Sequence, residues 1–596
     1  MPSLSLSWRR LAQATLTFSF IGLAACGSDG DDAGATPGAP PPVADAWPLV
    51  ETPTVTGPVV SEGFDSAIRN YTFFATDVAL RSRGYVEEEF YLQGQAKAYD
   101  APVSSAVPPT ANANVVATGV PYKTRFVVRR PADPARFNGT VVVEWLNVTD
   151  GFDGEYFWVQ AKDYLLRAGY AYVGVTAQDN AIANAALGLR QFSPARYGAL
   201  DVTGGGKVTQ DALSYDIYSQ AVKAARLQPQ VLGGLVPQRV IAAGMSQSGS
   251  RMGTYANYVH LRAPIVDAML IQVANPAVRD DLTTPLIKVL SESEATATNL
   301  ARSQPDTPTR RTWWVAATSH GDVVQRMGRT SVRLRDLGPA KTPSDNCLGG
   351  SVTTRTRAPF SHVVSAAVHH LDQQLRTGAV PPSGPLFQLA GTEPPSVARD
   401  GDGNALGGIR LAAADVPVAR ADGLQCGNIG AWVPFSDARL AALYPTHADY
   451  VAKVNAAAQA SVAAGFVLQE DAAKTVAEAQ SSAIGRGWTC GALCQGVSHF
   501  RPDFASTGLL RENLAYYDVV DGQALTQAAD DAHRWMAMGY TDTGAAAQYS
   551  FNFALAALQR FDSLALAAVA DGRLTPTAAD VLLSQSSTIA RQLVLE

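Results

Sequence analysis

A serine that could act as a nucleophile stands among small residues near the middle of the chain. An apolar, β-branched run ends in GMSQS at 244–248, and a helical pattern follows as far as Leu261. A strand, a sharp turn and a helix are the context in which a Gly-x-Ser-x-Gly elbow exposes its serine. The turn needs small residues two positions away on each side, and Gly244 and Ser248 supply them, with serine replacing the usual second glycine. The pattern predicts that Ser246 is a nucleophile; the alternative is a serine- and glycine-rich loop without chemistry.

A histidine that could take the proton of this serine follows another strand-like run. A serine hydroxyl is a weak nucleophile until an imidazole takes its proton and a carboxylate orients that imidazole. The run at 312–317 leads into His320, and Gly321 leaves the imidazole room to approach the serine. Loops at strand ends are where a parallel sheet can bring such groups together. We therefore predict His320 as the general base, the alternative being an ordinary surface histidine.

Two glutamates compete for the role of the acid. A predicted strand at 284–290 is followed by Glu292 and Glu294, so the chain order of serine, acid and histidine is the one that the elbow requires. In an extended chain two residues that are two apart share a face, and either carboxylate could reach His320. Glu294 stands where serine hydrolases commonly carry the acid, whereas Glu292 is nearer the strand and better placed for burial. We favour Glu294 and retain Glu292 as the alternative.

Two hydrogen-bond donors must also face the oxyanion that forms when a serine attacks a carbonyl group. The backbone N–H of Gln247, directly after the nucleophile, is the expected first donor. The second should come from the loop after the apolar run at 140–148, where no His-Gly-Gly-Gly sequence occurs. Asn147, Val148 and Thr149 are the candidates for it.

Several phrases of the sequence resemble one bacterial family, usually described only as alpha/beta hydrolase domain-containing proteins. These phrases are VEWLNVT at 143–149, PARYGAL at 194–200, SYDIYSQ at 214–220, GMSQSG at 244–249, VAATSHGD at 315–322, and GGIR at 407–410 with DVPVA at 415–419. The resemblance runs from about Leu49 to about Asp471 and implies a serine hydrolase fold with the residues named above as its triad. It implies no particular substrate. Met245, Ser248 and the C-terminal segment depart from the family pattern.

The N-terminus has the features of a lipoprotein signal peptide at residues 1–25. Arg9 and Arg10 precede an apolar stretch, 11–25, that is too short to span a bilayer and ends in small residues. The closing LAAC resembles a lipobox, in which Cys26 would be acylated and become the new N-terminus. No Asp follows it, which favours the outer membrane of a bacterial cell envelope. The alternative is an ordinary secretory signal with a chance cysteine.

Composition divides the rest of the chain. Residues 26–48 are rich in Gly, Asp and Pro and predict a disordered tether. The chain has 47% hydrophobic residues, enough to build a large core. We divide the remaining sequence into a hydrolase domain at 49–486 with helical additions and a helical region at 487–596. A net charge of −6 without a basic cluster argues against nucleic acid as a partner. We expect no membrane-spanning run after the signal peptide.

Alternating strand-like and helical segments predict an α/β fold with a doubly wound, mainly parallel sheet and an additional C-terminal helical region. The expected strands are 125–128, 140–148, 170–175, 239–243, 268–273, 286–290 and 313–317, and the expected helices are 155–167, 213–227, 247–261 and 358–375.

Four cysteines remain once Cys26 is set aside as the lipidation site. Cys347, Cys426, Cys490 and Cys494 are an even number in an oxidising compartment, and disulfides are expected. The short spacing of the last two favours a small loop bridge, which would leave the other two to pair. A metal site is the weaker alternative, and we predict no metal or cofactor.

Three classes of function are compatible with these residues. We prefer a serine esterase acting on a small-molecule or lipid-like ester from an N-terminal membrane anchor. An amidase, peptidase or acyltransferase could use the same triad, and a non-catalytic surface lipoprotein could use the fold alone. The ordered serine, acid and histidine argue against the last class, because a scaffold has no need of them.

Overall fold

The computed structural model describes most of the chain after its N-terminal segment. The described residues are 45–62, 68–102, 107–209, 211–338, 355–391, 394–482, 484–485, 510–511, 513–541 and 545–595. Contacts divide the chain into two units, Met1–Ala46 and Trp47–Glu596. The predicted signal peptide, Cys26 and nearly all of the tether lie outside the described residues and stay predictions.

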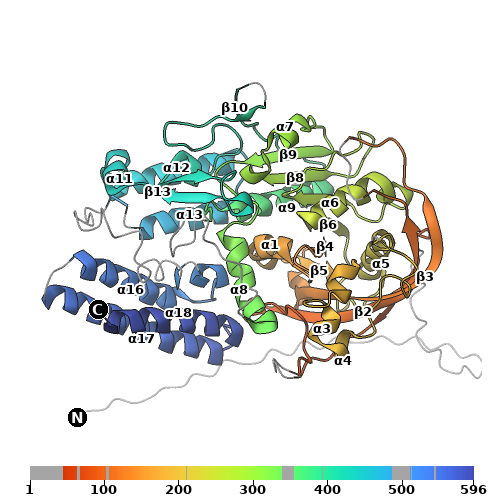
Figure 1. The fold of residues 1–596 in the computed structure, drawn as a ribbon, viewed down its shortest axis with the longest axis horizontal. Coiled ribbons are helices and arrows are strands. Elements are labelled where there is room, and N and C mark those ends of the chain that lie inside the picture. Colours follow the sequence, from red (N-terminus) through yellow and green to blue (C-terminus); the bar gives the residue numbers. More distant parts are fainter. Residues whose placement is uncertain are drawn as a thin grey trace, which may run out of the picture. The chain divides into compact units, whose positions relative to one another are not determined.

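A nine-stranded sheet forms the centre of the second unit (Figure 1). Its strand order is β1-β2-β3-β5-β4-β6-β7-β8-β9. The pairs from β5 through β4, β6, β7 and β8 to β9 are parallel, while β1, β2 and β3 pair antiparallel and join β5 antiparallel. The strands are β1 (Thr54–Thr56), β2 (Tyr85–Tyr99), β3 (Val115–Pro131), β4 (Thr140–Trp145), β5 (Ala171–Val175), β6 (Arg239–Met245), β7 (Ala268–Gln272), β8 (Leu286–Ser291) and β9 (Arg310–Val315).

Helices cover both faces of the parallel part, as the predicted doubly wound fold requires. Side chains alternate between the faces: Val240 and Ala242 of β6 join the core cluster under α5 and α6, whereas Ile241 and Ala243 join the one under α1 and α9. Because both faces are covered, the parallel strands consist mostly of apolar residues rather than alternating apolar and polar ones. The helices that matter here are α1 (Tyr156–Arg167), α5 (Ser214–Leu227), α6 (Gln247–Thr254), α8 (Val323–Leu337) and α9 (Phe360–Thr377).

The predicted fold class is confirmed, but several elements differ from the sequence expectation. Strand β2 has 15 residues and its partner β3 has 17, and only part of β3 was expected. The helix expected over 247–261 ends as an α-helix at Thr254 and continues as a π-turn (Tyr255–Val259) and a 3₁₀ turn (His260–Arg262). Strand β1, which forms one edge of the sheet and pairs Val55 with Leu92, was not expected either.

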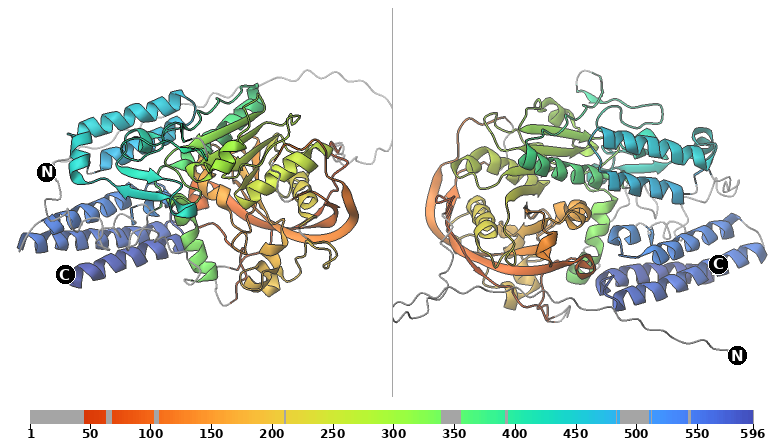
Figure 2. Two further views of the ribbon diagram at one scale, coloured as in Figure 1. Left: turned by 45° about the horizontal axis from the view of Figure 1, so that its top comes forward. Right: turned by 180° about the vertical axis from the view of Figure 1, so that it is seen from behind.

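The chain after α9 adds two small antiparallel strand pairs and two groups of helices (Figure 2). The first pair is β10 (Leu389–Ala390) with β11 (Ser396–Val397). Strands β12 (Ala419–Asp422) and β13 (Ala431–Pro434) pair antiparallel. They precede α11 (Asp437–Leu443), α12 (His447–Ala463) and α13 (Gln469–Ser481). Near the C-terminus, α16 (Gln523–Thr541), α17 (Ala545–Ala570) and α18 (Pro576–Leu595) pack on one another around an alanine- and leucine-rich cluster.

Polar contacts attach the C-terminal part of the chain to the hydrolase part. Lys162 of α1 donates to the Tyr516 carbonyl at 2.8 Å, and its ammonium lies 4.2 Å from the centre of that ring. Thr575, just before α18, donates from Oγ1 to the Asp77 carbonyl at 2.7 Å.

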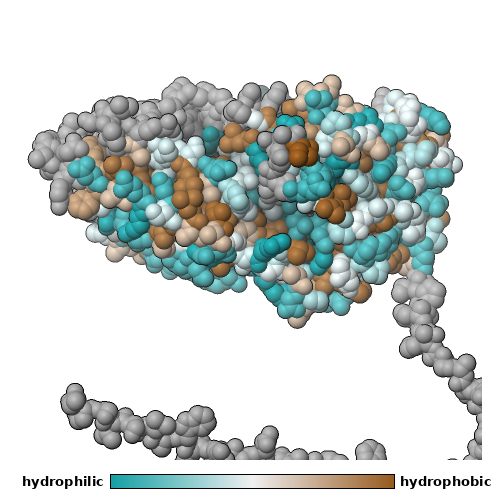
Figure 3. Space-filling view, turned by 90° about the horizontal axis from the view of Figure 1, so that it is seen from below, coloured by the Kyte–Doolittle hydropathy of each residue, from teal (hydrophilic) through white to brown (hydrophobic). Residues whose placement is uncertain are grey.

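Helix α17 contains a stretch, Ser550–Ala570, that is long and apolar enough to cross a membrane, contrary to our expectation of none. A third of its most apolar window is already buried against neighbouring residues. Hydrophobic side chains occur in small groups among hydrophilic ones on the face seen from below (Figure 3).

A buried ion network joins the antiparallel edge of the sheet to the loop after β4. Arg125 of β3 is 1% exposed and donates to Glu89 and Asp153, each at 2.8 Å. Glu89 also accepts from Arg196 and from the Tyr197 hydroxyl. A charge removed from water must be matched by its partners, so each member of the network depends on the others.

Removing the central cation of this network should destabilise the fold. We expect Arg125→Met to lower the free energy of unfolding by about 3–5 kcal/mol, because two carboxylates lose their buried partner. Denaturant unfolding followed by circular dichroism measures the change. Arg560→Met removes an exposed cation paired with Asp531 and is the matched control, with an expected loss below about 1 kcal/mol. Equal effects of the two substitutions would contradict this account.

Candidate active site

The serine of the predicted elbow adopts a strained backbone conformation between β6 and α6. Ser246 has φ 60° and ψ −117°, a region that non-glycine residues rarely enter. A Cβ atom at Gly244 would lie 2.6 Å from the Ser248 carbonyl oxygen, so only glycine fits there. The Ser248 hydroxyl accepts from Met245 N–H and donates to the Met245 carbonyl, both at 3.0 Å. Ser248 therefore serves as a brace of the turn where a glycine is more usual.

Ser246, His320 and Glu294 form a continuous hydrogen-bonded line. Nε2 of His320 lies 2.8 Å from Oγ of Ser246, and Nδ1 lies 2.7 Å from Oε1 of Glu294. The second oxygen of Glu294 accepts from the backbone N–H of Ser291 at 2.9 Å and from its hydroxyl at 2.6 Å. The carboxylate is thereby fixed at the end of β8 with one oxygen free for the imidazole.

The other candidate acid, Glu292, has a different set of partners. It is fully buried, accepts from Ala317 N–H at 2.8 Å, and pairs with Arg399 at 2.7 Å. Ala317 has φ 62°, a left-handed conformation that this hydrogen bond holds three residues before His320. Burial raises the pKa of Glu292, and the charge of Arg399 with the hydrogen bonds to the carboxyl group opposes that rise. Glu292 therefore braces the turn that leads to the histidine.

The β12–β13 hairpin closes over the same turn. Glu292 accepts from Gly423 N–H at 3.1 Å, and the Gly321 N–H donates to the Asn428 carbonyl at 2.7 Å. A Cβ atom at Gly423 would lie 2.2 Å from the Thr318 carbonyl oxygen, which makes glycine necessary for this approach. Ser293 contributes from the acid loop, accepting from His320 N–H at 3.1 Å and donating to Gly423.

The candidate oxyanion donors lie in two loops that touch each other. Gln247 is the first residue of α6, so its N–H has no carbonyl one turn earlier to bond. Thr149 N–H donates to Asn147 Oδ1 at 2.9 Å, and the amide of Asn147 donates to the Met245 carbonyl at 2.9 Å. Val148 N–H meets the Gln247 side chain at 3.3 Å. All three candidate N–H groups after β4 thus have an acceptor in the structure, since Asn147 N–H donates to the Gly154 carbonyl at 3.0 Å. Val148 N–H makes the longest of these contacts, which makes it the preferred candidate, and the second donor stays a prediction.

Ion pairs and a short bridge hold the loop after β4 in place. Asn147 and Gly154 exchange backbone hydrogen bonds at 3.0 and 2.8 Å, and Asp153 accepts from Arg125 of the buried network. Asp150 accepts from the Tyr156 hydroxyl at 2.6 Å and pairs with Arg333 of α8. A donor carried by this loop is thus fixed before a substrate arrives, as electrostatic stabilisation of an oxyanion requires.

Helix α8 begins at Val323, three residues after His320, and has the buried carboxyl group of Asp322 at its N-cap. Asp322 accepts from Gln325 N–H and from the Gln160 side chain, each at 2.9 Å. Burial raises the pKa of Asp322 to about 6, against these hydrogen bonds. The side-chain amide of Gln325 also donates to the sulfur of Met245 at 3.2 Å. The first turn of α8 therefore connects the histidine loop to the elbow.

Metal ligation has no candidate in the part of the chain that the structure describes, where no group of three His, Cys, Asp or Glu side chains could hold an ion. Of the four cysteines expected to pair, only Cys426 falls within the described residues. Cys347, Cys490 and Cys494 do not, and the pairing stays a prediction.

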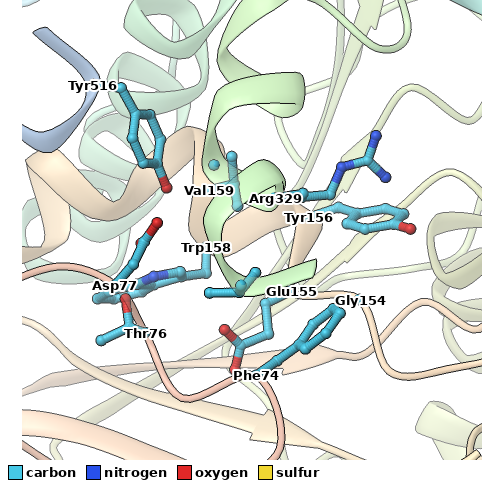
Figure 4. Close-up of a pocket in the computed structure, with 12 residues that line it drawn as sticks. Phe74, Thr76, Asp77, Gly154, Glu155, Tyr156, Trp158, Val159, Arg329 and Tyr516 are labelled. Carbon is cyan, nitrogen blue, oxygen red and sulfur yellow. The ribbon is translucent and has the colours of Figure 1, made fainter. Parts of the chain in front are cut away.

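A pocket lies between α1, α8 and Tyr516 (Figure 4). Its lining includes Asp77, Glu155, Tyr156 and Tyr516, and no member of the Ser246 line. The Tyr516 hydroxyl and the Asp77 carboxyl point toward each other in Figure 4. Burial raises the pKa of both groups above their ordinary values.

Sequence reasoning missed the groups that support the line of three. Arg399, Gly423 and Asn428 come from a segment whose phrases we used only for family resemblance. A glycine in an otherwise polar turn was the one local signal of the close approach at Gly423. Nothing local indicates that Glu292 faces Arg399, because the two residues are far apart in the sequence.

Comparisons with known proteins agree with this architecture. A family model described as "Alpha/beta hydrolase domain" matches residues 52–477, and no curated protein matches. Among solved structures, a ferulic acid esterase from Streptomyces cinnamoneus is 12% identical with a TM-score of 0.29, covering 47% of this chain and 89% of its own. A glucuronoyl esterase from Solibacter usitatus is 9% identical with a TM-score of 0.23, covering 39% and 76%. Such distant likenesses carry no conclusion about activity. The family match extends over most of the chain, and the protein belongs to the alpha/beta hydrolase domain family.

Proposed function

We propose that this protein is a serine hydrolase that cleaves carboxylic esters through an acyl-enzyme intermediate. The observation that carries the proposal is the line from Ser246 through His320 to Glu294, with contacts of 2.8 and 2.7 Å, at the carboxyl ends of parallel strands. A nucleophile, a base within hydrogen-bonding reach and a group that orients the base are the requirements of this chemistry. An ester is the acyl donor that we assign, with small-molecule and lipid-like esters as the substrate class.

Each residue then has a defined step. Nε2 of His320 takes the proton of Ser246 as Oγ attacks the carbonyl carbon, while Glu294 holds the proton on Nδ1. The N–H groups of Gln247 and Val148 face the negative oxygen of the tetrahedral intermediate. His320 returns the proton to the departing alcohol, which leaves an acyl group on Ser246. Water, activated by the same imidazole, then releases the acid and restores the serine.

Replacing the nucleophile should abolish reaction without unfolding the protein. Ser246→Ala is expected to lose all labelling by a fluorophosphonate and all hydrolysis of p-nitrophenyl esters. Ser250→Ala, four residues along α6, is the matched control and should retain both. Labelling that persists in Ser246→Ala would contradict the assignment. Faster cleavage of p-nitroanilides than of p-nitrophenyl esters by the wild type would instead indicate an amidase or peptidase, and transfer to an added alcohol would indicate an acyltransferase.

The two glutamates should separate by the size of their effects on turnover. Glu294→Gln leaves the imidazole without its anionic partner and should lower kcat by about 10³–10⁴-fold, as in other triads. Glu292→Gln leaves that contact intact and should cost far less in kcat while lowering thermal stability, because Arg399 loses its buried partner. Steady-state kinetics and thermal unfolding of both variants provide the comparison. A larger kcat loss for Glu292→Gln would reverse the roles.

We also propose that the mature chain is anchored in the bacterial cell envelope by acylation of Cys26. What supports the proposal is the LAAC sequence after a short apolar stretch, with a polar tether behind it. Two or more acyl chains give stable membrane attachment, whereas one chain does not. The outer membrane is the favoured location.

Loss of the anchor should leave a competent hydrolase. A chain that starts at Asp45 keeps Trp47, whose indole donates to the Pro264 carbonyl at 2.7 Å, and should be active in the absence of membrane. Cys26→Ser in the full chain should shift the protein out of the membrane fraction or leave its signal uncleaved. Intact-mass measurement of native protein is the direct check. A mature N-terminus without acyl mass, or one other than Cys26, would show an ordinary secreted hydrolase.

A further inference from the structure

The side chain of Gln247 continues the polar network of the site beyond its three central residues. Its Oε1 accepts from Val148 N–H at 3.3 Å, and its Nε2 donates to Gln178 Oε1 at 2.9 Å. Val148 N–H is the second oxyanion donor of the proposed reaction. Gln247 thus supplies the first proposed oxyanion donor from its backbone N–H, and its side chain accepts the hydrogen bond of the second, Val148 N–H.

The direction of this amide is fixed by a tryptophan. An indole N–H can only donate, and that of Trp145 lies 3.1 Å from Gln178, so the atom of Gln178 at that place is its oxygen. The nitrogen of Gln178 then donates to Asp211 at 2.9 Å. Because an oxygen of Gln178 also faces Gln247, the amide nitrogen of Gln247 must complete that bond. Its oxygen is therefore left to face Val148.

An N–H has one hydrogen, so Val148 serves either Gln247 or the substrate oxygen. The present contact of 3.3 Å is longer than the usual N–H···O range, and it joins two neutral groups. A neutral ester carbonyl is no stronger an acceptor than the amide oxygen already there. A charged oxyanion is a much stronger one, because charge-assisted hydrogen bonds are about twice as strong as neutral ones. Transfer of the Val148 hydrogen bond from Gln247 to the substrate is thus favoured only as negative charge develops on the substrate oxygen.

We propose that Gln247 is a positioning residue that withholds Val148 N–H from the bound ester and releases it to the tetrahedral intermediate. This inference rests on the proposed ester hydrolysis, and it explains how the site could stabilise the tetrahedral intermediate more than the bound ester. An interaction made in the transition state and absent from the ground state raises the acylation rate, whereas one made in both only tightens binding. The network of Trp145 and Gln178 returns the amide to its place after each cycle.

Gln247→Met tests the proposal, because methionine has a similar length and cannot replace either hydrogen bond. With Val148 N–H uncovered, the ester should bind more tightly, with its dissociation constant lowered about 2- to 10-fold by one net hydrogen bond. The ratio of acylation rate constant to dissociation constant should not fall. Pre-steady-state acylation of the full chain by p-nitrophenyl esters gives the two constants separately. An unchanged or weaker ester affinity overturns the proposal and makes Gln247 a simple brace.

Two further variants complete the test. Asn180 donates to the carbonyl of Val148 at 2.8 Å, so Asn180→Ala loosens the same residue without uncovering its N–H and should not tighten ester binding. Gln247→Glu keeps a permanent acceptor on Val148 and should slow acylation by about 10²-fold or more. Tighter binding in Asn180→Ala, or normal acylation in Gln247→Glu, counts against the proposal. If the wild type neither hydrolyses esters nor labels at Ser246, the proposed function fails and this inference with it, whereas a reactive wild type with a failing Gln247→Met overturns the inference alone.

Discussion

The strained conformation of one residue organises the site. Ser246 holds a positive φ only because β6 and α6 approach closely at Gly244, and because Ser248 satisfies the backbone of Met245. This turn raises the hydroxyl above the sheet and makes Gln247 the first residue of a helix, with its N–H available. The cost of such a conformation, of the order of 1–3 kcal/mol, is met by the fully buried strand on one side and the helix on the other.

The two neighbouring glutamates show how environment divides the work of identical side chains. Glu294 has a partly accessible imidazole as its partner, whereas Glu292 faces an arginine and two backbone N–H groups in the interior. A carboxylate bound to the imidazole stabilises the cation that forms during reaction. One bound to backbone N–H groups fixes a turn. The second role maintains the geometry on which the first depends, since Ala317 and His320 belong to the same turn.

Local sequence patterns predict the parallel part of the sheet and the loops that carry Ser246, Glu294 and His320, because parallel strands buried on both faces leave a clear apolar signature. They also place those loops at one edge, since the carboxyl ends of parallel strands lie together. Strand β2 escapes prediction because its face toward Arg125 is charged, with Glu89 buried in the ion network. The contacts of Glu292 with Arg399 and Gly423 escape for another reason: they join segments that only the folded chain brings together.

The hairpin at Ala419–Pro434 has a consequence for the order in which the protein becomes competent. During translation, the elbow leaves the ribosome long before the segment that holds Gly321 and Glu292 from above. A nascent chain that ends before this segment contains Ser246, Glu294 and His320, but it lacks the partners of the turn that supports His320. The proposed activity would therefore be acquired only after the hairpin has been synthesised and has packed on this turn.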